Sequence, residues 1–327
     1  MAKTLALDEF VSIANEDTAT RGTFADAVVA IPYEKGSLTL YDKPVYIDAE
    51  LGGVGNFGPI KSDLAELYSA GGWAGPIFND SVGHELRCLA GKPDSSSQIG
   101  STGVYEHTFE NKEGAEHDSM SVTTKEANEN LGYPFYMIDT WNLEWGKAQY
   151  VKRTVEGMGR SSEGKTTSNP AAVDVSQMFL PNMVSVKLAA DTAGLSSATN
   201  IKSISGNLNF SKNVALQYIT GRADKNPDDI NNGEVMVEGS IELFMENPTE
   251  RAKVFGNTPQ AIEVNMATGT GSTLQGLKFT LNVSVLNDFE KLRSDHTRQR
   301  INFKVNRPAL GTEPYEIVLT NRRANAY

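Results

Sequence analysis

Apolar and polar residues alternate along much of the chain, and the pattern is clearest over residues 233–256. Apolar side chains there occupy every second position: Val235, Val237, Ile241, Leu243 and Met245. A period of two is what a strand with one buried face needs. Similar runs follow at 262–266 and 277–285. This part of the chain therefore predicts several strands that share one core.

A short helix is predicted directly after the first of these strands. Asn247 can cap it, Pro248 suits its first position, and Gly256 can close it. Residues 73–91 repeat the same order in the first half of the chain: an apolar run, a capping residue, a short helical stretch and a closing glycine. Strands are expected after it at 104–109 and 120–123.

The two stretches keep nearly the same spacing, which indicates an internal repeat. Phe78 and Phe244 lie 166 positions apart, and Gly91 and Gly256 lie 165 apart. Self-similarity at a fixed period is a sign of repeated structural units. We therefore expect two related β units in tandem. The expected division is an N-terminal arm over 1–20, a first β domain over 21–175 and a second over 176–327.

The rest of the first half gives less regular signals. Residues 37–41 and 45–49 read as short strands separated by a turn at Pro44, and Ser62 is placed to cap a two-turn helix. The first residues read as an arm or a short amphipathic helix. The Gly- and Ser-rich stretch 157–174 reads as a linker or a projecting loop. Strands dominate and helices are short, so the expected fold is mainly β, a sandwich or barrel with short flanking helices.

Composition narrows the classes of function. The 327 residues carry a net charge of -11, which argues against a protein that grips nucleic acid through its phosphates. A single cysteine excludes an internal disulfide framework and fits assembly in a reducing cytoplasm. Acidic residues interrupt the apolar N-terminal stretch, so we expect no secretory signal, and no apolar run is long enough to predict a transmembrane span.

One segment matches a nucleotide-binding motif letter for letter. Residues 159–166, GRSSEGKT, fit the P-loop pattern, in which a glycine loop between a strand and a helix cradles phosphates. Pro170 follows closely, and the residue before a proline avoids the helical region. No alternation of helices and strands accompanies the motif. We interpret the match as coincidence and expect no catalytic residue, no cofactor and no enzyme activity.

The candidate metal sites are weak for the same kind of reason. Residues 224–228 begin like a calcium loop, but the required glycine and the closing glutamate are missing. His84 and Cys88 share a helical spacing, yet zinc needs two further ligands. His107 and His117 are isolated in the sequence. We expect no metal site.

Aromatic residues on the predicted strands leave two interpretations open. Trp141 and Trp145 share a parity within the run YPFYMIDTWNLEW. Such residues are most often core or cross-strand packing. The alternative is a stacking platform for a carbohydrate or another surface ligand.

The layout as a whole resembles the phage tail tube family, in particular the major tail proteins of siphophages. The resemblance is carried by YSAGGWAGPIF before a short helix, VYEHTF followed by SMSVTTKE, the block YPFYMIDTWNLEWGKAQYVKRTVEGMG and the later unit GEVMVEGSIELF. It spans roughly residues 48–315 as a pattern of strands without an invariant motif.

The resemblance implies a structural virion protein that assembles with itself. In this family, inner strands of neighbouring subunits join into a barrel around a DNA channel, and rings stack into a tube. A duplicated chain would close such a ring with three copies, which we favour over six. Further implied partners are the tail tip and terminator proteins, with DNA passing through the lumen without specific binding and no membrane contact. The implied location is the virion tail, after assembly in the host cytoplasm.

Two other classes of function stay open at this point. A β-sandwich binding module or virion adhesin would present Trp141 and Trp145 to a ligand and would remain monomeric. An enzyme that uses the loop 159–166 would bind nucleotide through Lys165. In the tube interpretation, the N-terminal arm or the loop 157–174 would bridge successive rings.

Overall fold

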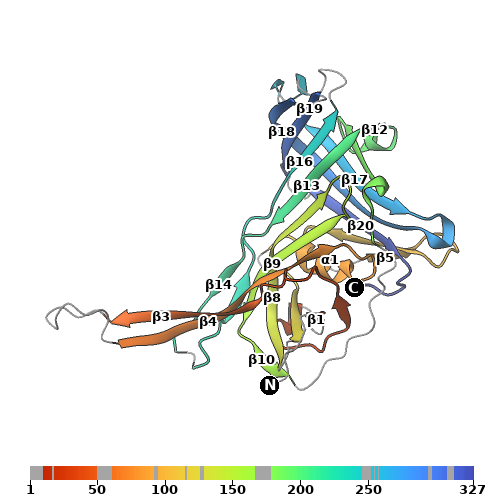
Figure 1. The fold of residues 1–327 in the computed structure, drawn as a ribbon. Helices are drawn as coiled ribbons and strands as arrows, with labels where there is room; N and C mark the ends of the chain where they lie inside the picture. Colours follow the sequence, from red (N-terminus) through yellow and green to blue (C-terminus); the bar gives the residue numbers. More distant parts are fainter. Residues whose placement is uncertain are drawn as a thin grey trace.

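Strands make up most of the structure, as the alternating pattern predicts (Figure 1). A computed structural model describes residues 10–16, 18–49, 61–91, 95–114, 116–125, 129–165, 178–221, 223–244, 252–253, 255–256, 258–293, 297–307 and 313–327. The elements of the first half are β1 (Phe10–Glu16), β2 (Val29–Ile31), β3 (Tyr41–Ala49), β4 (Lys61–Pro76), α1 (Val82–Ala90), β5 (Ser95–Gln98), β6 (Tyr105–Glu110), β7 (Ser119–Lys125), β8 (Asn130–Trp145), β9 (Lys152–Arg160) and β10 (Glu163–Lys165).

The second half continues in the same style, and four 3-10 turns occur among the described residues. Its strands are β11 (Val184–Ala189), β12 (Asn200–Ile201), β13 (Ser203–Ser211), β14 (Ala215–Gln217), β15 (Asp229–Asn231), β16 (Met236–Phe244), β17 (Gln260–Thr268), β18 (Gln275–Arg293), β19 (Thr297–Val305) and β20 (Tyr315–Asn321). The 3-10 turns are η1 (Thr18–Thr20), η2 (Pro181–Met183), η3 (Ala193–Ser196) and η4 (Gly271–Thr273).

Eight strands lie side by side in what we call the central sheet. Their order is β3–β4–β9–β8–β13–β16–β19–β18, and every neighbouring pair is antiparallel. The two long strands β8 and β18 each leave this sheet at their N-terminal part. There β8 pairs with β7 and β10, and β18 pairs with β17 and β20. The long strands thus tie the central sheet to a second layer.

The core lies between these layers. Trp141 of β8 and Phe210 of β13 both pack against Phe279 of β18, and Phe210 also meets Tyr315 of β20 edge to face. All four side chains are almost completely buried. Rings in such offset and edge contacts add to the free energy gained by burying them. The central sheet therefore has one apolar face, turned toward the second layer.

Helix α1 forms where a short helix is predicted, and it is buried on nearly all sides. It contacts β8, β1 and β6. Gly91 ends it in the left-handed conformation at φ 72°, with its N–H bonded to the Arg87 carbonyl. A side chain at this glycine would collide with the His117 ring. The predicted helix and its closing glycine are therefore confirmed here. In the second half the predicted cap residues Asn247 and Pro248 lie outside the described residues, and the Gly256 N–H bonds to the Ala252 carbonyl.

Several expectations for the first half are wrong. The residues after Ser62 form strand β4, and β3 runs without a turn through Pro44. The apolar spacing of Leu64, Leu67 and Tyr68 imitates a helix, but these residues lie in a hairpin whose partner strand supplies the backbone hydrogen bonds. Pro44 is tolerated because β3 is an edge strand.

The segments expected to form an N-terminal arm and a linker also differ from expectation. Residues 10–16 form strand β1, which is largely buried between β7 and β2, so they are neither an arm nor a helix. Residues 157–160 belong to β9 and 163–165 to β10. The glycines of β9 serve close packing, since a Cβ at Gly157 would meet the Met137 carbonyl oxygen at 2.2 Å. Residues 1–9 and 166–177 lie outside the described part.

The same pairing scheme occurs twice along the chain. In the first half, β1 pairs with β2 and β7, β4 with β3 and β9, and β8 with β7, β9 and β10. In the second half, β11 pairs with β12 and β17, β16 with β13 and β19, and β18 with β17, β19 and β20. The order of the strands in the chain also matches. The ribbons β5–β6 and β14–β15 interrupt the scheme, one in each half.

Candidate assembly surface

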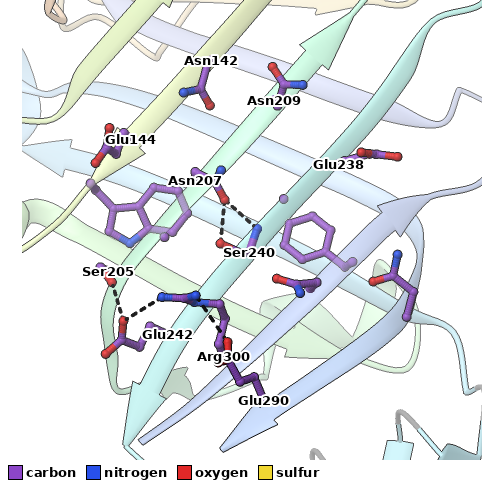
Figure 2. Close-up of a pocket in the computed structure, with 16 residues that line it drawn as sticks. Asn142, Glu144, Ser205, Asn207, Asn209, Glu238, Ser240, Glu242, Glu290 and Arg300 are labelled. Carbon is purple, nitrogen blue, oxygen red and sulfur yellow. Dashed lines mark hydrogen bonds and ion pairs between the residues drawn. The ribbon is translucent and has the colours of Figure 1, made fainter. Parts of the chain in front are cut away.

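The face of the central sheet that points away from the core is polar across several strands. On this face Asn142 of β8 lies opposite Asn209 of β13, and Glu144 of β8 lies opposite Asn207 of β13. The row continues through Ser240 of β16, whose N–H and hydroxyl both donate to the Asn207 side chain (Figure 2). Together with residues of β18 and β19 these side chains line a shallow groove of about 800 Å³. This groove is a broad polar surface, without the apolar walls of a typical small-molecule site.

Three cationic side chains on this face have carboxylate partners. Arg300 lies between Glu242 and Glu290, at 3.8 and 3.4 Å from their carboxylate oxygens (Figure 2). Arg298 also contacts Glu242, at 3.1 Å, and Lys304 lies 3.9 Å from Glu238. Ion pairs at a protein surface contribute little stability, but they neutralise the charges that would attract phosphates.

The two outer strands of the central sheet have open edges. Strand β3 pairs with β4, and residues 285–293 of β18 pair with β19; no other pairing is found for either edge among the described strands. Tyr41, Tyr46 and Ile47 of β3 are 52, 59 and 65% exposed. An open edge with exposed apolar side chains is a template for pairing with another strand. In Figure 1 the β3–β4 hairpin projects well beyond the body of the molecule.

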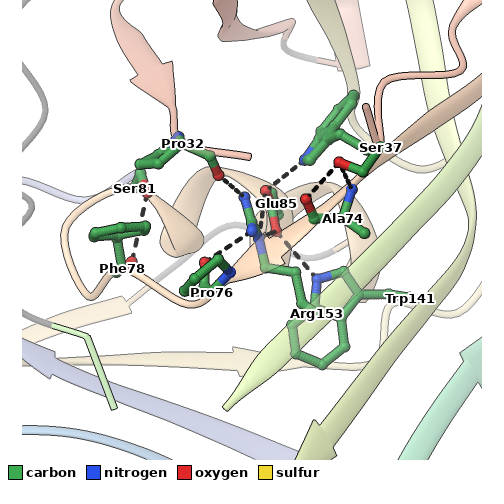
Figure 3. Close-up of polar contacts among 10 residues, drawn as sticks. Pro32, Ser37, Ala74, Pro76, Phe78, Ser81, Glu85, Trp141 and Arg153 are labelled. Atoms are coloured by element: carbon green, nitrogen blue, oxygen red, sulfur yellow. Dashed lines mark hydrogen bonds and ion pairs between the residues drawn. The ribbon is translucent and has the colours of Figure 1, made fainter. Parts of the chain in front are cut away.

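A buried charged cluster fixes helix α1 to the sheet beneath this surface. The Glu85 carboxylate accepts from Arg153 Nε at 3.0 Å, from Trp73 Nε1 at 3.0 Å and from Trp141 Nε1 at 3.2 Å (Figure 3). Arg153 also donates to the carbonyls of Pro76 and Pro32. Glu85 is completely buried and Arg153 is 1% exposed. Both charges lose their contact with water on burial, and the fixed donors and acceptors of the cluster replace it.

A second buried cation lies at the other end of α1. Lys212 is completely buried, and its Nζ donates to the Cys88 carbonyl at 2.8 Å. Burial lowers the pKa of Lys212 to about 8 and raises the pKa of the Cys88 thiol. Burial also lowers the pKa of His84 and of His117 to about 3. A thiol whose pKa is raised is a poor nucleophile, so Cys88 has the character of a packed core residue.

The structure explains the motif matches as parts of strands and turns. Gly159 lies in β9 and residues 163–165 form β10, so the P-loop-like segment has strand geometry where a phosphate loop needs a helix start. Lys165 contacts Glu163 at 3.0 Å and lies over the Phe24 ring. The calcium-like segment binds the sheet instead, since the Asn226 side chain accepts from the Ser161 N–H and Arg160 donates to the carbonyls of Pro227 and Asp228.

The histidines and the tryptophans are packed inside the molecule. His84 and Cys88 lie in α1 as expected, and no cluster of three or more His, Cys, Asp and Glu suited to a metal ion occurs in the described ranges. His107 bonds to Asn321 and to the Arg323 carbonyl. Trp141 and Trp145 are 0 and 3% exposed, which removes the stacking platform on which the adhesin alternative rested. Within the same part of the chain, no helix has the length and apolar character to cross a membrane.

A comparison with known families decides between the remaining classes. The family model of the phage tail tube protein matches residues 10–315, nearly the whole chain. The chain belongs to the phage tail tube protein family. No curated protein matches the sequence. The family consists of structural proteins of the virion tail, so this tail tube protein is a structural tail component that assembles with itself and with other tail proteins.

The sequence did not predict which residues form the candidate assembly surface. The polar face is visible in the sequence as the residues that alternate with the apolar ones, such as Asn207, Asn209, Ser240 and Glu242. The order of the strands, which brings these residues together, joins segments from both halves of the chain. The open edge at β3 was hidden because the hairpin resembles a turn followed by a helix.

Proposed function

We propose that this tail tube protein closes into rings through the two open edges of its central sheet, and that stacked rings form the channel for DNA ejection. The observation that carries the proposal is a continuous eight-stranded sheet with one apolar face and one polar face, whose two outer edges have no partner among the described strands. Joining β18 of one copy to β3 of the next removes both edges at once. Closure is the most complete way for a sheet to avoid uncontrolled edge pairing.

The width of the channel supports three copies per ring. Three copies would give a barrel of about 24 strands, and a spacing of ~4.8 Å with a tilt of ~40° gives a backbone diameter of about 48 Å. Side chains reaching inward by about 5 Å leave a lumen of about 38 Å, wider than a DNA duplex. Two copies would leave only about 22 Å by the same reckoning. The duplicated pairing scheme would then give a ring of three chains a pseudo-six-fold inner wall.

The polar face of the central sheet is the natural lining of this channel. It offers amides, hydroxyls and carboxylates, and Arg298, Arg300 and Lys304 on it have carboxylate partners. Tight binding of DNA requires cations that can displace the counterions of phosphates. A wall on which acids hold these cations lets DNA pass without being bound.

The β3–β4 hairpin is the best candidate for contact between successive rings. It projects from the body and exposes Tyr46 and Ile47, which a contact with another copy would bury. This role was expected of the N-terminal arm or of the loop 157–174. Residues 10–16 and 157–165 instead lie within sheets. Tail tip and terminator proteins would contact the two ends of the tube, in virions assembled in the host cytoplasm.

Electron microscopy of the purified protein over a concentration series tests the proposal, with light scattering for mass. We expect rings or hollow tubes, and a ring mass about three times the 35.5 kDa of the chain. A ring of six copies would refute the three-copy closure. A strictly monomeric protein at every concentration, also in the presence of preformed tail tips, would refute assembly through the open edges.

A further inference from the structure

The junction between β8 and β13 joins the two copies of the pairing scheme within one chain. Its register is defined over six residue pairs, among them Ser211 opposite Thr140 and Asn209 opposite Asn142. Strand β8 belongs to the first half and β13 to the second. In the repeated scheme β18 corresponds to β8, and β3 corresponds to β13. The internal junction therefore supplies a template with which a junction between β18 of one copy and β3 of the next can be compared.

The correspondence of β8 and β18 is fixed by an irregularity that both strands share. In β8 the register against β9 shifts between Ile138 and Thr140, and in β18 the register against β19 shifts between Leu286 and Asp288. A bulge of this kind is a specific feature of a strand, because it re-aims the residues beyond it. Aligning the two bulges makes Asp288 the counterpart of Thr140.

The correspondence of β3 and β13 rests on a shared hydrogen bond. The Gly72 N–H donates to the Thr39 side chain at 3.1 Å, and the Ser240 N–H donates to the Asn207 side chain at 2.8 Å. The neighbouring glycines agree with this alignment. A Cβ at Gly71 would meet the Thr39 carbonyl oxygen at 2.1 Å, and a Cβ at Gly239 would meet the Asn207 carbonyl oxygen at 2.6 Å. Thr39 is thus the counterpart of Asn207.

The two alignments agree although they were made on opposite sides of the sheet. Residues that pair across neighbouring strands form a row that crosses the sheet. One such row in each half contains the aligned residues, and each member of the first row has its counterpart at the same place in the second. In the first half the row is Thr140, Glu156, Gly72 and Thr39; in the second it is Asp288, Asn302, Ser240 and Asn207. A shift of one residue in either alignment would break this match and would turn side chains to the other face.

We infer that β18 pairs with β3 of the neighbouring copy in the register of the internal junction, with Asp288 opposite Lys43 and Glu290 opposite Tyr41. The inference rests on the proposed ring and adds to it the residues that meet. Lys43 and Tyr41 are the counterparts of Ser211 and Asn209. The register sets a lysine directly opposite an aspartate, a favourable cross-strand pair on one face of a sheet. Lys43 is charged at neutral pH like any lysine at the surface, and a hydrogen bond with the Tyr41 side chain raises its pKa further.

The end of the inferred ladder is also marked in the sequence. In the internal junction the Lys212 N–H donates to the Asp139 carbonyl at 2.8 Å, directly after the last strand pair. The counterpart of Lys212 in β3 is Pro44, which has no N–H to donate. The Thr39 N–H bonds to Gly72 of β4, so alternation directs the backbone groups of the even-numbered residues 40 and 42 toward the open edge. The ladder between copies therefore ends at Lys43.

Cysteine cross-linking of the full chain tests this register. Lys43 and Asp288 form a non-hydrogen-bonded pair in the inferred ladder, with Cα atoms about 4.5 Å apart, which suits a disulfide. The variant Lys43→Cys/Asp288→Cys should shift under mild oxidation from one-chain to two- and three-chain bands in a non-reducing gel. The matched control is Lys43→Cys/Leu292→Cys. Leu292 lies on the same strand and face, four residues away, so this variant should stay at the one-chain band.

The outcomes separate the register from the ring itself. Rings seen by electron microscopy, together with cross-linking of the control but not of the 43/288 pair, would overturn the register and leave the proposed ring intact. Cross-linking of neither variant in intact rings would overturn the β18–β3 junction. Exchange of the charges, Lys43→Asp with Asp288→Lys, gives a second measure without cysteine. Each single change should weaken ring formation, and the double change should restore it.

Discussion

Glu85 offers the sharpest test of how the core is held together. Its carboxylate is completely buried and accepts hydrogen bonds from Arg153, Trp73 and Trp141. The substitution Glu85→Gln keeps the size of the side chain and removes the negative charge. Arg153 is then a buried cation without a counter-ion, and a guanidinium cannot neutralise itself by losing its proton.

The expected loss follows from the burial of the pair. Breaking a buried ion pair by changing one partner costs about 3–5 kcal/mol, because the other charge remains uncompensated. Arg153 keeps its bonds to the carbonyls of Pro76 and Pro32, which spread its charge. We therefore expect Glu85→Gln to lower the free energy of unfolding by about 3 kcal/mol, toward the lower end of that range.

Urea denaturation of the unassembled chain, followed by tryptophan fluorescence, measures this loss. The matched control is Glu34→Gln, which removes the exposed partner of Lys152 next to Arg153 in the sequence. That change should cost at most about 0.5 kcal/mol, as for other exposed pairs. Equal losses for the two variants, or a loss below about 1 kcal/mol for Glu85→Gln, would refute the assignment of the cluster as the anchor of α1.

Three further predictions concern the backbone and the buried titratable groups. Gly71→Ala should destabilise the fold by about 3 kcal/mol, because φ at this residue is +120° and a Cβ would collide with the backbone of Thr39. The control is Gly164→Ala, since a Cβ at Gly164 would meet no neighbouring atom. It should change stability by less than about 0.5 kcal/mol in the same urea assay. Lys212 has a pKa of about 8 in the folded chain and 10.5 in the unfolded chain. Between these pH values the unfolded chain binds more protons, so the free energy of unfolding should rise with pH. Lys212→Met should remove this rise in urea titrations at several pH values. The pKa of His84 is about 3 in the folded chain and 6.5 in the unfolded chain, so stability should fall as pH drops from 6.5 toward 3. The variant His84→Gln keeps an acceptor for Arg323 and should show a smaller fall in thermal melts over this pH range.

The sequence predicted best those elements whose pattern is local. The alternation at 235–245 gave β16, the runs after it gave β17 and β18, and the closing glycine gave the end of α1. The spacing of 166 and 165 between the two halves lies close to the 168 that separates Gly71 from Gly239. Buried faces of strands and helix ends depend on neighbouring residues, which a single sequence contains.

Other features failed because tertiary contacts decided them. Strand β4 carries helix-like apolar spacing, and its state is set by pairing with β3 and β9. Strand β1 is short, and its burial comes from β7, more than a hundred residues away. The assembly surface depends on the β8–β13 junction, which joins the halves of the chain. No periodicity within either half indicates which strands of the two halves meet.

The β8–β13 junction also changes how ring formation depends on the amount of protein. In the proposed three-chain ring, half of the inner-wall junctions would form during folding, at any dilution, because linked strands meet in an intramolecular event. A ring of three full chains then loses the translational and rotational freedom of three molecules, whereas a ring of half-length chains would lose that of six. Each additional molecule adds to this entropic cost. The rate at which new rings nucleate should accordingly follow about the third power of the chain concentration, where separate half-length chains would follow about the sixth. In the proposed tube, such a subunit would begin assembly while the concentration of the chain is still low.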